Sequence, residues 1–221
     1  MGDLSLDYLF EHPGEIFGLA VDHLVLSLTV LVLGFLIALP LGLLATRFRR
    51  LTFPLLAGLG ALYTVPSLAF LAVLIPSLGL GRDNAIVVLI AYAQIFMVRN
   101  IVAGLRGVDE PTLEAARGIG MTSWQVFRQV RWPLALPIVM AGIRTALVTT
   151  ISLATMAAAV KGGGLGELLF IGLGRMDAPQ VGLPMVLAGA IAITALAILA
   201  DLVLRLVERQ TAIARARRAM R

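Results

Sequence analysis

The residues best suited to specific chemistry lie in a polar segment, residues 114–137, between two very apolar stretches. It begins with Glu114, Ala115 and Ala116, and Gly120 follows after three more residues. A carboxylate can pair with an arginine or lysine of a partner, and small neighbours let that partner approach closely. We therefore interpret the segment as a loop that leaves a lipid bilayer and docks on a partner. The alternative is an ordinary loop that rests on lipid headgroups.

A short helix is predicted around Glu114. Asp109 can cap its N-terminus, and a proline in the first turn suits a helix start. Glu110 in the same turn complements the helix dipole. The helix is predicted over Pro111–Arg117. The residues expected on its exposed side, next to the carboxylate, are Leu113, Ala115 and Ala116.

A glycine bend and a second helix are predicted next. Gly118 and Gly120 provide a helix stop. Thr122 with Gln125 three residues later forms a capping-box pattern, which marks a helix start. Apolar and basic residues alternate after this cap, so we expect an amphipathic helix at the membrane interface. The chain is predicted to re-enter the bilayer at Pro133.

The composition identifies lipid as the main solvent. Hydrophobic residues make up 59% of the 221 residues and charged residues only 14%, whereas a soluble domain has about 45–50% and about 25%. The chain has no cysteine, so thiolate metal sites and disulfides are excluded. Its two histidines, His12 and His23, are expected to be a solvated residue and a polar group at a helix end rather than metal ligands. We expect no metal site, cofactor or catalytic group.

An all-α membrane protein with about five transmembrane helices is the predicted fold class, because about 20 apolar residues cross a bilayer. The predicted spans are residues 24–45, 51–81 (a helix and a loop), 84–98, 133–160 and 178–200. The predicted organisation is an external segment (1–23), a transmembrane domain (24–207) with a cytoplasmic loop at about 106–132, and a basic cytoplasmic tail (208–221). The acidic first 21 residues lack the basic start of a signal peptide, so no cleavage is expected.

The orientation is predicted from the arginines and lysines. Fourteen of them lie in one set of connections and the C-terminal tail, whereas the opposite set has only Arg82, Lys161 and Arg175. Basic residues concentrate on the cytoplasmic side of membrane proteins. The C-terminus and the loop around Glu114 are therefore predicted to be cytoplasmic and the N-terminus external. Arg144 lies inside the fourth predicted span. The sequence allows three arrangements: Arg144 forms an ion pair with Asp201, lines a cavity, or reaches the cytoplasmic interface.

A helix-breaking patch interrupts the second predicted span at residues 63–67, which read Tyr-Thr-Val-Pro-Ser. A proline at membrane depth is tolerated where neighbours or a water-lined cavity satisfy the freed carbonyl. The patch is therefore either a packing kink or part of the wall of a solute path. Further on, a glycine-rich run, residues 162–166, precedes a short apolar segment, residues 168–173, that is predicted to be re-entrant or interfacial. The run lacks the Gly-Lys-Ser/Thr ending of a phosphate-binding loop, and Lys161 precedes it.

The segment around Glu114 resembles the EAA motif of ABC importer permeases. The resemblance rests on Glu114-Ala115-Ala116, Gly120 after three residues, Val130 after nine more, and then Trp132-Pro133 after one. Valine stands where the motif has isoleucine, and tryptophan where it has leucine. Both replacements remain apolar. The resemblance implies that Glu114, Ala115, Ala116 and Gly120 couple the subunit to an ATPase.

Further stretches resemble one branch of that family, the permeases for osmoprotectants such as glycine betaine, choline, carnitine and proline. These stretches are residues 65–69, 98–105, 141–145 and 162–166. The resemblance implies a type I importer fold in the bacterial inner membrane. It also implies a second permease subunit (the same or a sister chain), a pair of cytoplasmic ATPases and an external solute-binding protein. The candidate gate loop comprises Gly162, Gly163, Gly164 and Gly166.

A polar path for the solute is expected under this interpretation. Its candidate lining residues are Tyr63, Thr64, Pro66, Ser67, Gln94, Thr149 and Thr150. Aromatic side chains bind quaternary ammonium groups through cation–π attraction, and the mid-span candidates are Tyr63, Phe70, Tyr92 and Phe96. Because these are few, we expect high-affinity recognition to reside in the external binding protein.

Three alternatives remain. A permease for methionine or another amino acid would share the loop and the glycine run. An ion-coupled secondary transporter would require buried carboxylates and an inverted repeat, and we find neither in the sequence. An intramembrane enzyme would require a cluster of catalytic or metal-binding residues within the spans. No histidine lies in the later spans, and Asp201 is the only acidic residue there.

Overall fold

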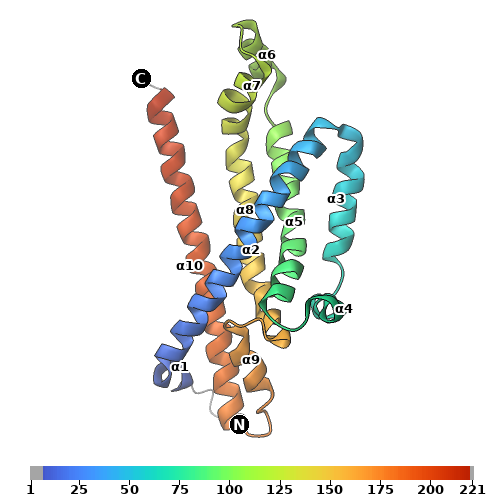
Figure 1. Cartoon of the computed structure of the whole chain (residues 1–221). Coiled ribbons are helices and arrows are strands. Elements are labelled where there is room, and N and C mark those ends of the chain that lie inside the picture. The colour runs from blue at the N-terminus through green and yellow to red at the C-terminus, as the bar shows by residue number, and fades with distance from the viewer. Residues whose placement is uncertain (1–6, 220–221) are drawn as a thin grey trace.

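The computed structural model describes residues 7–219, and the side chains of residues 8–208. Within this part, all regular structure is helical (Figure 1). The elements are α1 (Asp7–Glu11), α2 (Pro13–Arg47), α3 (Arg49–Tyr63), α4 (Ser67–Leu78), α5 (Arg82–Arg106), α6 (Glu110–Gly118), α7 (Ser123–Gln125), the π-helical segment η1 (Val126–Arg131), α8 (Trp132–Ala154), the 3-10 helix η2 (Thr155–Val160), α9 (Gly166–Leu173) and α10 (Pro179–Ala219).

Helices α5 and α8 form the centre of the subunit. Small residues let their backbones approach closely: a Cβ on Gly142 would collide with Asn100, and one on Gly104 would lie 2.8 Å from the Ala135 carbonyl oxygen. Close approach through small residues is the usual way in which membrane helices gain packing energy. The core around this pair contains the fully buried Ile101 and Met97.

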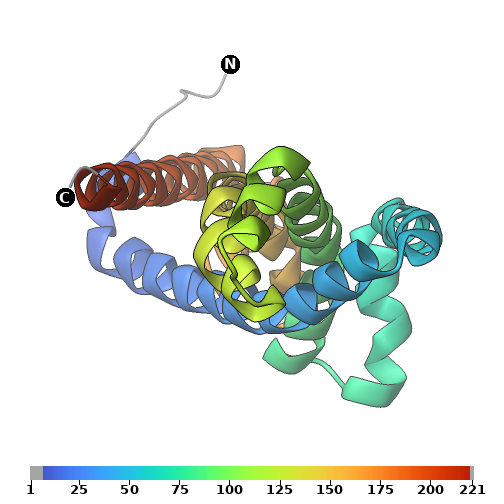
Figure 2. The same cartoon turned by 90° about the horizontal axis from the view of Figure 1, so that it is seen from above.

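Helix α2 crosses the central pair obliquely (Figures 1 and 2). It begins at Pro13, well before the predicted start at Leu24, so part of the predicted external segment is helical. His23 consequently lies inside a helix and is fully buried, with its Nε2 2.8 Å from the Ile151 carbonyl oxygen. The prediction of a polar group at a helix end was wrong for this residue. His12 precedes α2 and stacks on Tyr8.

The second predicted span is broken into α3 and α4, whose axes differ by 93°. The break falls at the predicted patch, since α3 ends at Tyr63 and α4 begins at Ser67. The segment after the break is helical up to Leu78, so little of the loop predicted within residues 51–81 is present. With this pair counted as one crossing there are up to five candidate spans in the described part of the chain; the other four are single helices.

The third span is longer than predicted. Helix α5 runs from Arg82 to Arg106, so Arg99 lies within the helix rather than at the end of a span that stops at Val98. At the opposite end of the chain, α10 continues helically to Ala219. The side chains of the predicted basic tail beyond Glu208 lie outside the described residues.

The two ends of the molecule carry different elements. Helices α6 and α7 and the C-terminal end of α10 lie at one end, and helices α1 and α9 lie at the other (Figure 1). Helix α10 packs against α9 and part of α8 and then diverges from α8 towards its C-terminal end. This arrangement matches an odd number of membrane crossings, with the polar loop and the C-terminal end of α10 on the same side.

Candidate functional site

Helix α6 forms as the sequence predicts. The Asp109 carboxylate accepts hydrogen bonds from the backbone N–H of Thr112 at 3.1 Å and from its hydroxyl at 2.6 Å. The hydroxyl, and then the amide, of Thr112 lower the pKa of Asp109 below its ordinary value. The cap is therefore ionised at neutral pH, where its charge also complements the N-terminal end of the helix dipole.

The outer face of α6 is exposed, and Glu114 and Ala115 lie on it. The neighbouring Glu110 pairs with Arg117, whose Nη1 lies 2.8 Å from the Glu110 carboxylate. By contrast, the Glu114 carboxylate forms no ion pair or hydrogen bond among the described residues. A free carboxylate next to a small residue is thus available to a cationic group of a partner.

The inner face of α6 packs against the following helix. Leu113 is 1% exposed and Ala116 is 7% exposed, and both belong with Val126 to a small apolar cluster. The prediction that Leu113 and Ala116 would be exposed was therefore wrong, because this cluster attaches α6 to the rest of the subunit. Ala115 remains on the outer face. The cluster holds α6 against the following segment of its own chain, so α6 is not a free loop.

The glycine bend and the second cap are confirmed. Gly120 has φ +85°, a left-handed conformation that side chains other than glycine rarely adopt, and a Cβ there would meet open space. Thr122 and Gln125 form the predicted capping box, with reciprocal side-chain and backbone hydrogen bonds of 3.3 Å and 2.7 Å. Gly118 belongs to α6 itself and has an ordinary helical conformation.

A separate interfacial helix is absent from the described structure. After Gln125 the chain passes through the π-helical segment η1 directly into α8, so residues 123–160 form one continuous candidate span. Pro133 fits the first turn of α8 and does not interrupt the helix. The apolar residues of the amphipathic pattern do not lie on the membrane interface as a separate helix. They pack against α6 or form the start of the span. The side chains of Ile119 and Trp124 beside α6 are 79% and 65% exposed.

The break between α3 and α4 presents the predicted path residues. Tyr63, Thr64 and Pro66 are exposed, and Ser67 is half-buried. The Tyr92 hydroxyl donates a hydrogen bond to the Val65 carbonyl, which the break leaves without a helical partner. This bond explains how the chain tolerates the break at membrane depth.

Aromatic rings surround the break. Tyr63 packs edge-to-face on Tyr92 and Phe96, with ring centroids 5.6 Å and 5.2 Å apart, and Phe70 packs on Tyr92 at 6.0 Å. The four mid-span aromatics of the sequence analysis are thus brought together, but they contact one another and do not form an open cage. Tyr63 is 38% exposed and Tyr92 only 3%, so the Tyr63 ring is the one that a solute can reach more easily.

The remaining path candidates lie elsewhere. Gln94 is 4% exposed and donates from Nε2 to the Gly34 carbonyl oxygen at 3.1 Å, so it ties α5 to α2. Thr150 is 2% exposed and Thr149 is half-buried in α8. In this conformation neither Gln94 nor Thr150 opens onto the surface that the break presents.

The glycine run packs against α2. A Cβ on Gly164 would lie 2.8 Å from His23 Nδ1, and one on Gly163 would collide with the Asp22 carboxylate. Asp22 also forms an ion pair with Arg82, at the start of α5. Gly162 approaches Ala157, and Gly166 approaches the Thr155 carbonyl. The glycines therefore serve as a packed junction between α2, η2 and α9, and the predicted short apolar segment after them is helix α9.

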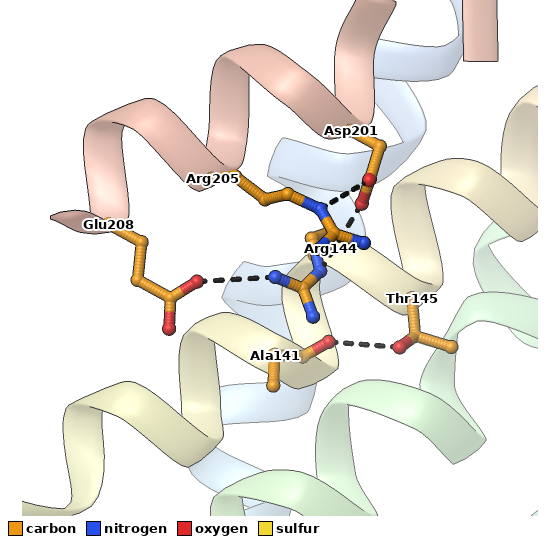
Figure 3. Close-up of polar contacts among 6 residues, drawn as sticks. All are labelled: Ala141, Arg144, Thr145, Asp201, Arg205 and Glu208. Carbon is orange, nitrogen blue, oxygen red and sulfur yellow. Dashed lines mark hydrogen bonds and ion pairs between the residues drawn. The ribbon is translucent and has the colours of Figure 1, made fainter. Parts of the chain in front are cut away.

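A charged cluster joins α8 to α10 (Figure 3). Arg144 Nε lies 3.3 Å from Asp201 Oδ1, and its Nη1 lies 3.3 Å from Glu208 Oε2. Asp201 also accepts from Arg205 at 2.6 Å. The ion pair with Asp201 was one of the three arrangements that the sequence left open. Glu208 was missed, although its spacing of seven residues from Asp201 places both on one helix face.

Comparison with known proteins agrees with this geometry. The family described as binding-protein-dependent transport system inner membrane component matches residues 32–213. The chain is 41% identical over 205 residues to the glycine betaine/carnitine/choline transport system permease protein OpuCB of Bacillus subtilis, covering 93% of this chain and 92% of that protein. It is 36% identical to the osmoprotectant import permease protein OsmW of Salmonella typhimurium, covering 89% and 92%.

Solved structures show the same fold. A chain of the MetNI methionine ABC transporter in an inward-facing conformation superimposes with a TM-score of 0.76 at 25% identity, covering 90% of this chain and 98% of that one. A chain of an amino acid ABC transporter crystallised with histidines superimposes with a TM-score of 0.73 at 18% identity, covering 93% and 98%. The family match over most of the length, the membrane-spanning helices and the docked α6 lead to one conclusion: this chain belongs to the inner membrane permease subunits of binding-protein-dependent ABC importers.

Proposed function

We propose that this chain is the permease subunit of an ATP-driven importer for quaternary ammonium and related osmoprotectants, such as glycine betaine, choline, carnitine or proline. The observation that carries the substrate class is the 41% identity, over 93% of the chain, to a permease named for glycine betaine, carnitine and choline. The chain itself has no ATPase site under this proposal. It works with a pair of cytoplasmic ATPases, a second permease subunit that is the same or a sister chain, and an external solute-binding protein.

Helix α6 is the proposed contact with the ATPase. Three features support this role: the free Glu114 carboxylate, the small Ala115 beside it, and the exposed apolar side chains of Ile119 and Trp124 at the same end of the molecule. Large apolar and aromatic side chains are enriched in the centre of protein interfaces, and polar groups lie on the rim. Ala116 would contribute from the inner face, where it holds α6 against Val126.

Coupling requires that α6 moves together with the membrane helices. The Leu113, Ala116 and Val126 cluster and the helical continuity from η1 into α8 support such movement, because a push on α6 is transmitted to α8 rather than absorbed by a loose loop. Gly120 then sets the angle between α6 and the span. ATP-dependent closure of the ATPases would shift the two permease subunits between inward- and outward-open states, provided that the closed ATPase binds one state better.

The break between α3 and α4 is the proposed wall of the solute path, with Tyr63, Thr64, Pro66 and Ser67 facing it. The exposed ring of Tyr63 can attract a quaternary ammonium group weakly. Its neighbours Tyr92 and Phe96 use their rings in edge-to-face contacts, which suits a path that binds loosely and releases quickly. Thr149, which is half-buried in α8, is a further proposed residue of the path. The run from Gly162 to Gly166 is the proposed external gate.

The partner assignment can be tested by purification of the tagged chain from its host in mild detergent, followed by mass spectrometry. The expected result is recovery of a Walker-motif ATPase, and its loss in Glu114→Lys. Glu110→Lys is the matched control, because Glu110 lies on the same helix but is already paired with Arg117. Repeated recovery of the chain alone, with uptake insensitive to ATP depletion, would instead indicate a secondary transporter.

A permease for methionine or another amino acid is the second candidate function. The observation in its favour is the superposition on the MetNI methionine transporter with a TM-score of 0.76. Uptake of labelled glycine betaine and of labelled methionine, measured separately, separates the two candidates, since each type of importer takes up its own solute and not the other.

A further inference from the structure

A pocket of about 280 Å³ lies between α2, α5 and η1, at the end of the molecule that carries α6. Its lining residues are Leu43, Thr46, Arg47, Leu105, Phe127 and Arg131. Two of these are arginines and none is acidic. Two guanidinium groups that face one small pocket repel each other unless an anion lies between them, so the composition of the lining indicates an anionic ligand.

The two arginines are available for such a ligand. The Arg47 side chain forms no hydrogen bond or ion pair within the described part of the chain. Arg131 donates from Nε to the Leu105 carbonyl oxygen at 2.8 Å, which fixes its guanidinium at the pocket wall. Its two terminal nitrogens have no partner among the described residues. A guanidinium fixed in this way binds a phosphate with little loss of side-chain freedom.

The apolar part of the lining distinguishes between classes of anion. Leu43, Leu105 and Phe127 contribute three of the six lining residues, which a freely hydrated ion does not require. A phospholipid presents a phosphate next to glycerol and acyl carbons, and so matches both parts of the lining. The pocket lies near the ends of candidate spans, on the side that the arginine distribution predicts to be cytoplasmic. Basic pockets between membrane helices on this side suit anionic headgroups.

From these observations we propose that the pocket binds the phosphate of an anionic phospholipid in the cytoplasmic leaflet. Arg47 and Arg131 hold the phosphate oxygens, and Leu43, Leu105 and Phe127 contact the glycerol and the first acyl carbons. The lipid would lie between the end of α2 and the segment that joins α6 to α8. It would thus contact η1, the segment through which the proposed ATPase contact is joined to α8.

Native mass spectrometry of the purified importer complex with added phosphatidylglycerol tests this site. The variants are Arg47→Gln and the double variant Arg47→Gln/Arg131→Gln. The Arg47 side chain forms no hydrogen bond or ion pair among the described residues, so its replacement should not disturb the fold. Arg49→Gln/Arg50→Gln is the matched control, because it removes the same charge from the same end of the molecule, from exposed residues outside the pocket lining. The expected result is roughly tenfold weaker phosphatidylglycerol retention in the double pocket variant, an intermediate loss for Arg47→Gln, and little loss in the control.

Equal retention by the pocket variant and the control would overturn the proposal. So would a pocket variant that keeps the lipid but loses the ATPase, because the arginines would then serve a partner carboxylate. A third arm adds inorganic phosphate in excess. Displacement of phosphatidylglycerol by inorganic phosphate in the wild type, but not in the pocket variant, would assign the site to the free anion, whereas no displacement supports the lipid.

Discussion

At the scale of single residues, Gly120 and Gly118 differ in a way that the sequence alone does not show. Both lie beside the EAA segment, and a Cβ on either would meet no atom within 4 Å. Only Gly120 has a positive φ, +85°. A side chain at Gly120 is therefore opposed by backbone conformation and not by lack of space, and a left-handed residue other than glycine costs about 1–2 kcal/mol.

The two glycines provide a matched pair of variants. Gly120→Ala, and more strongly Gly120→Val, should insert normally but lose most of the ATP hydrolysis that solute-loaded binding protein stimulates, because the bend that orients α6 is strained. Gly118→Ala should retain this stimulation, since alanine favours the helix by about 1 kcal/mol. Stimulated hydrolysis in the reconstituted complex is the measurement. Equal activity of Gly120→Val and the wild type would exclude a role for the bend in coupling.

At the scale of elements, the break between α3 and α4 depends on Tyr92. Its hydroxyl satisfies the Val65 carbonyl, while its ring packs on Tyr63 and Phe70. Tyr92→Phe keeps the ring and removes the hydrogen bond, which is worth about 1 kcal/mol. We expect the midpoint of thermal unfolding to fall by a few degrees.

Tyr63→Phe is the control for this prediction, because the Tyr63 hydroxyl forms no hydrogen bond among the described residues while its ring makes the same kind of edge-to-face contacts. Its unfolding midpoint should stay close to that of the wild type. An equal decrease in both variants would mean that the hydroxyl of Tyr92 does not support the break.

The charged cluster between α8 and α10 gives rise to a second prediction, on the stability of α10. Arg144 is the residue that joins α8 to both Asp201 and Glu208 (Figure 3). Arg144→Gln leaves these half-buried carboxylates with less compensation, at a cost of about 2 kcal/mol. Amide hydrogen exchange in the C-terminal half of α10 should become faster. Arg205→Gln, which removes a more exposed charge, should change the exchange little. A larger effect of Arg205→Gln than of Arg144→Gln would mean that Arg144 does not hold α10 against α8.

The sequence predicted some elements better than others, for physical reasons. Helix caps and bends depend on neighbouring residues in the sequence. The predictions of the Asp109 cap, the Thr122 capping box and helix α6 were therefore correct. Which face of α6 is buried depends on Val126, a contact between elements, and Leu113 was therefore assigned to the wrong side. The ends of the spans were also misplaced, because hydropathy marks where lipid begins and α2 and α5 continue beyond it.

At the scale of the whole molecule, the account requires that α6 and the segment between α9 and α10 lie on opposite sides of the membrane. The two regions lie at opposite ends of the subunit (Figure 1). The chain has no cysteine, so single cysteines can report on each side without further changes. Ile119 and Asp177 are both exposed and suit this purpose.

A membrane-impermeant maleimide added to intact cells should label Asp177→Cys and leave Ile119→Cys unlabelled. After the cells are opened and the membranes are stripped of the bound ATPase, both variants should react. Labelling of Ile119→Cys in intact cells would reverse the orientation, and with it the assignment of α6 to the cytoplasmic ATPase.

Uptake of labelled glycine betaine into proteoliposomes that contain the permease, its ATPase and the solute-loaded binding protein tests the central claim most directly. The account predicts that uptake requires ATP in the vesicle lumen, on the side where the ATPase lies. Uptake should be lost in Glu114→Lys and Gly120→Val and should continue in Gly118→Ala. Uptake that persists without ATP, or that is unchanged in Glu114→Lys and Gly120→Val, would contradict it.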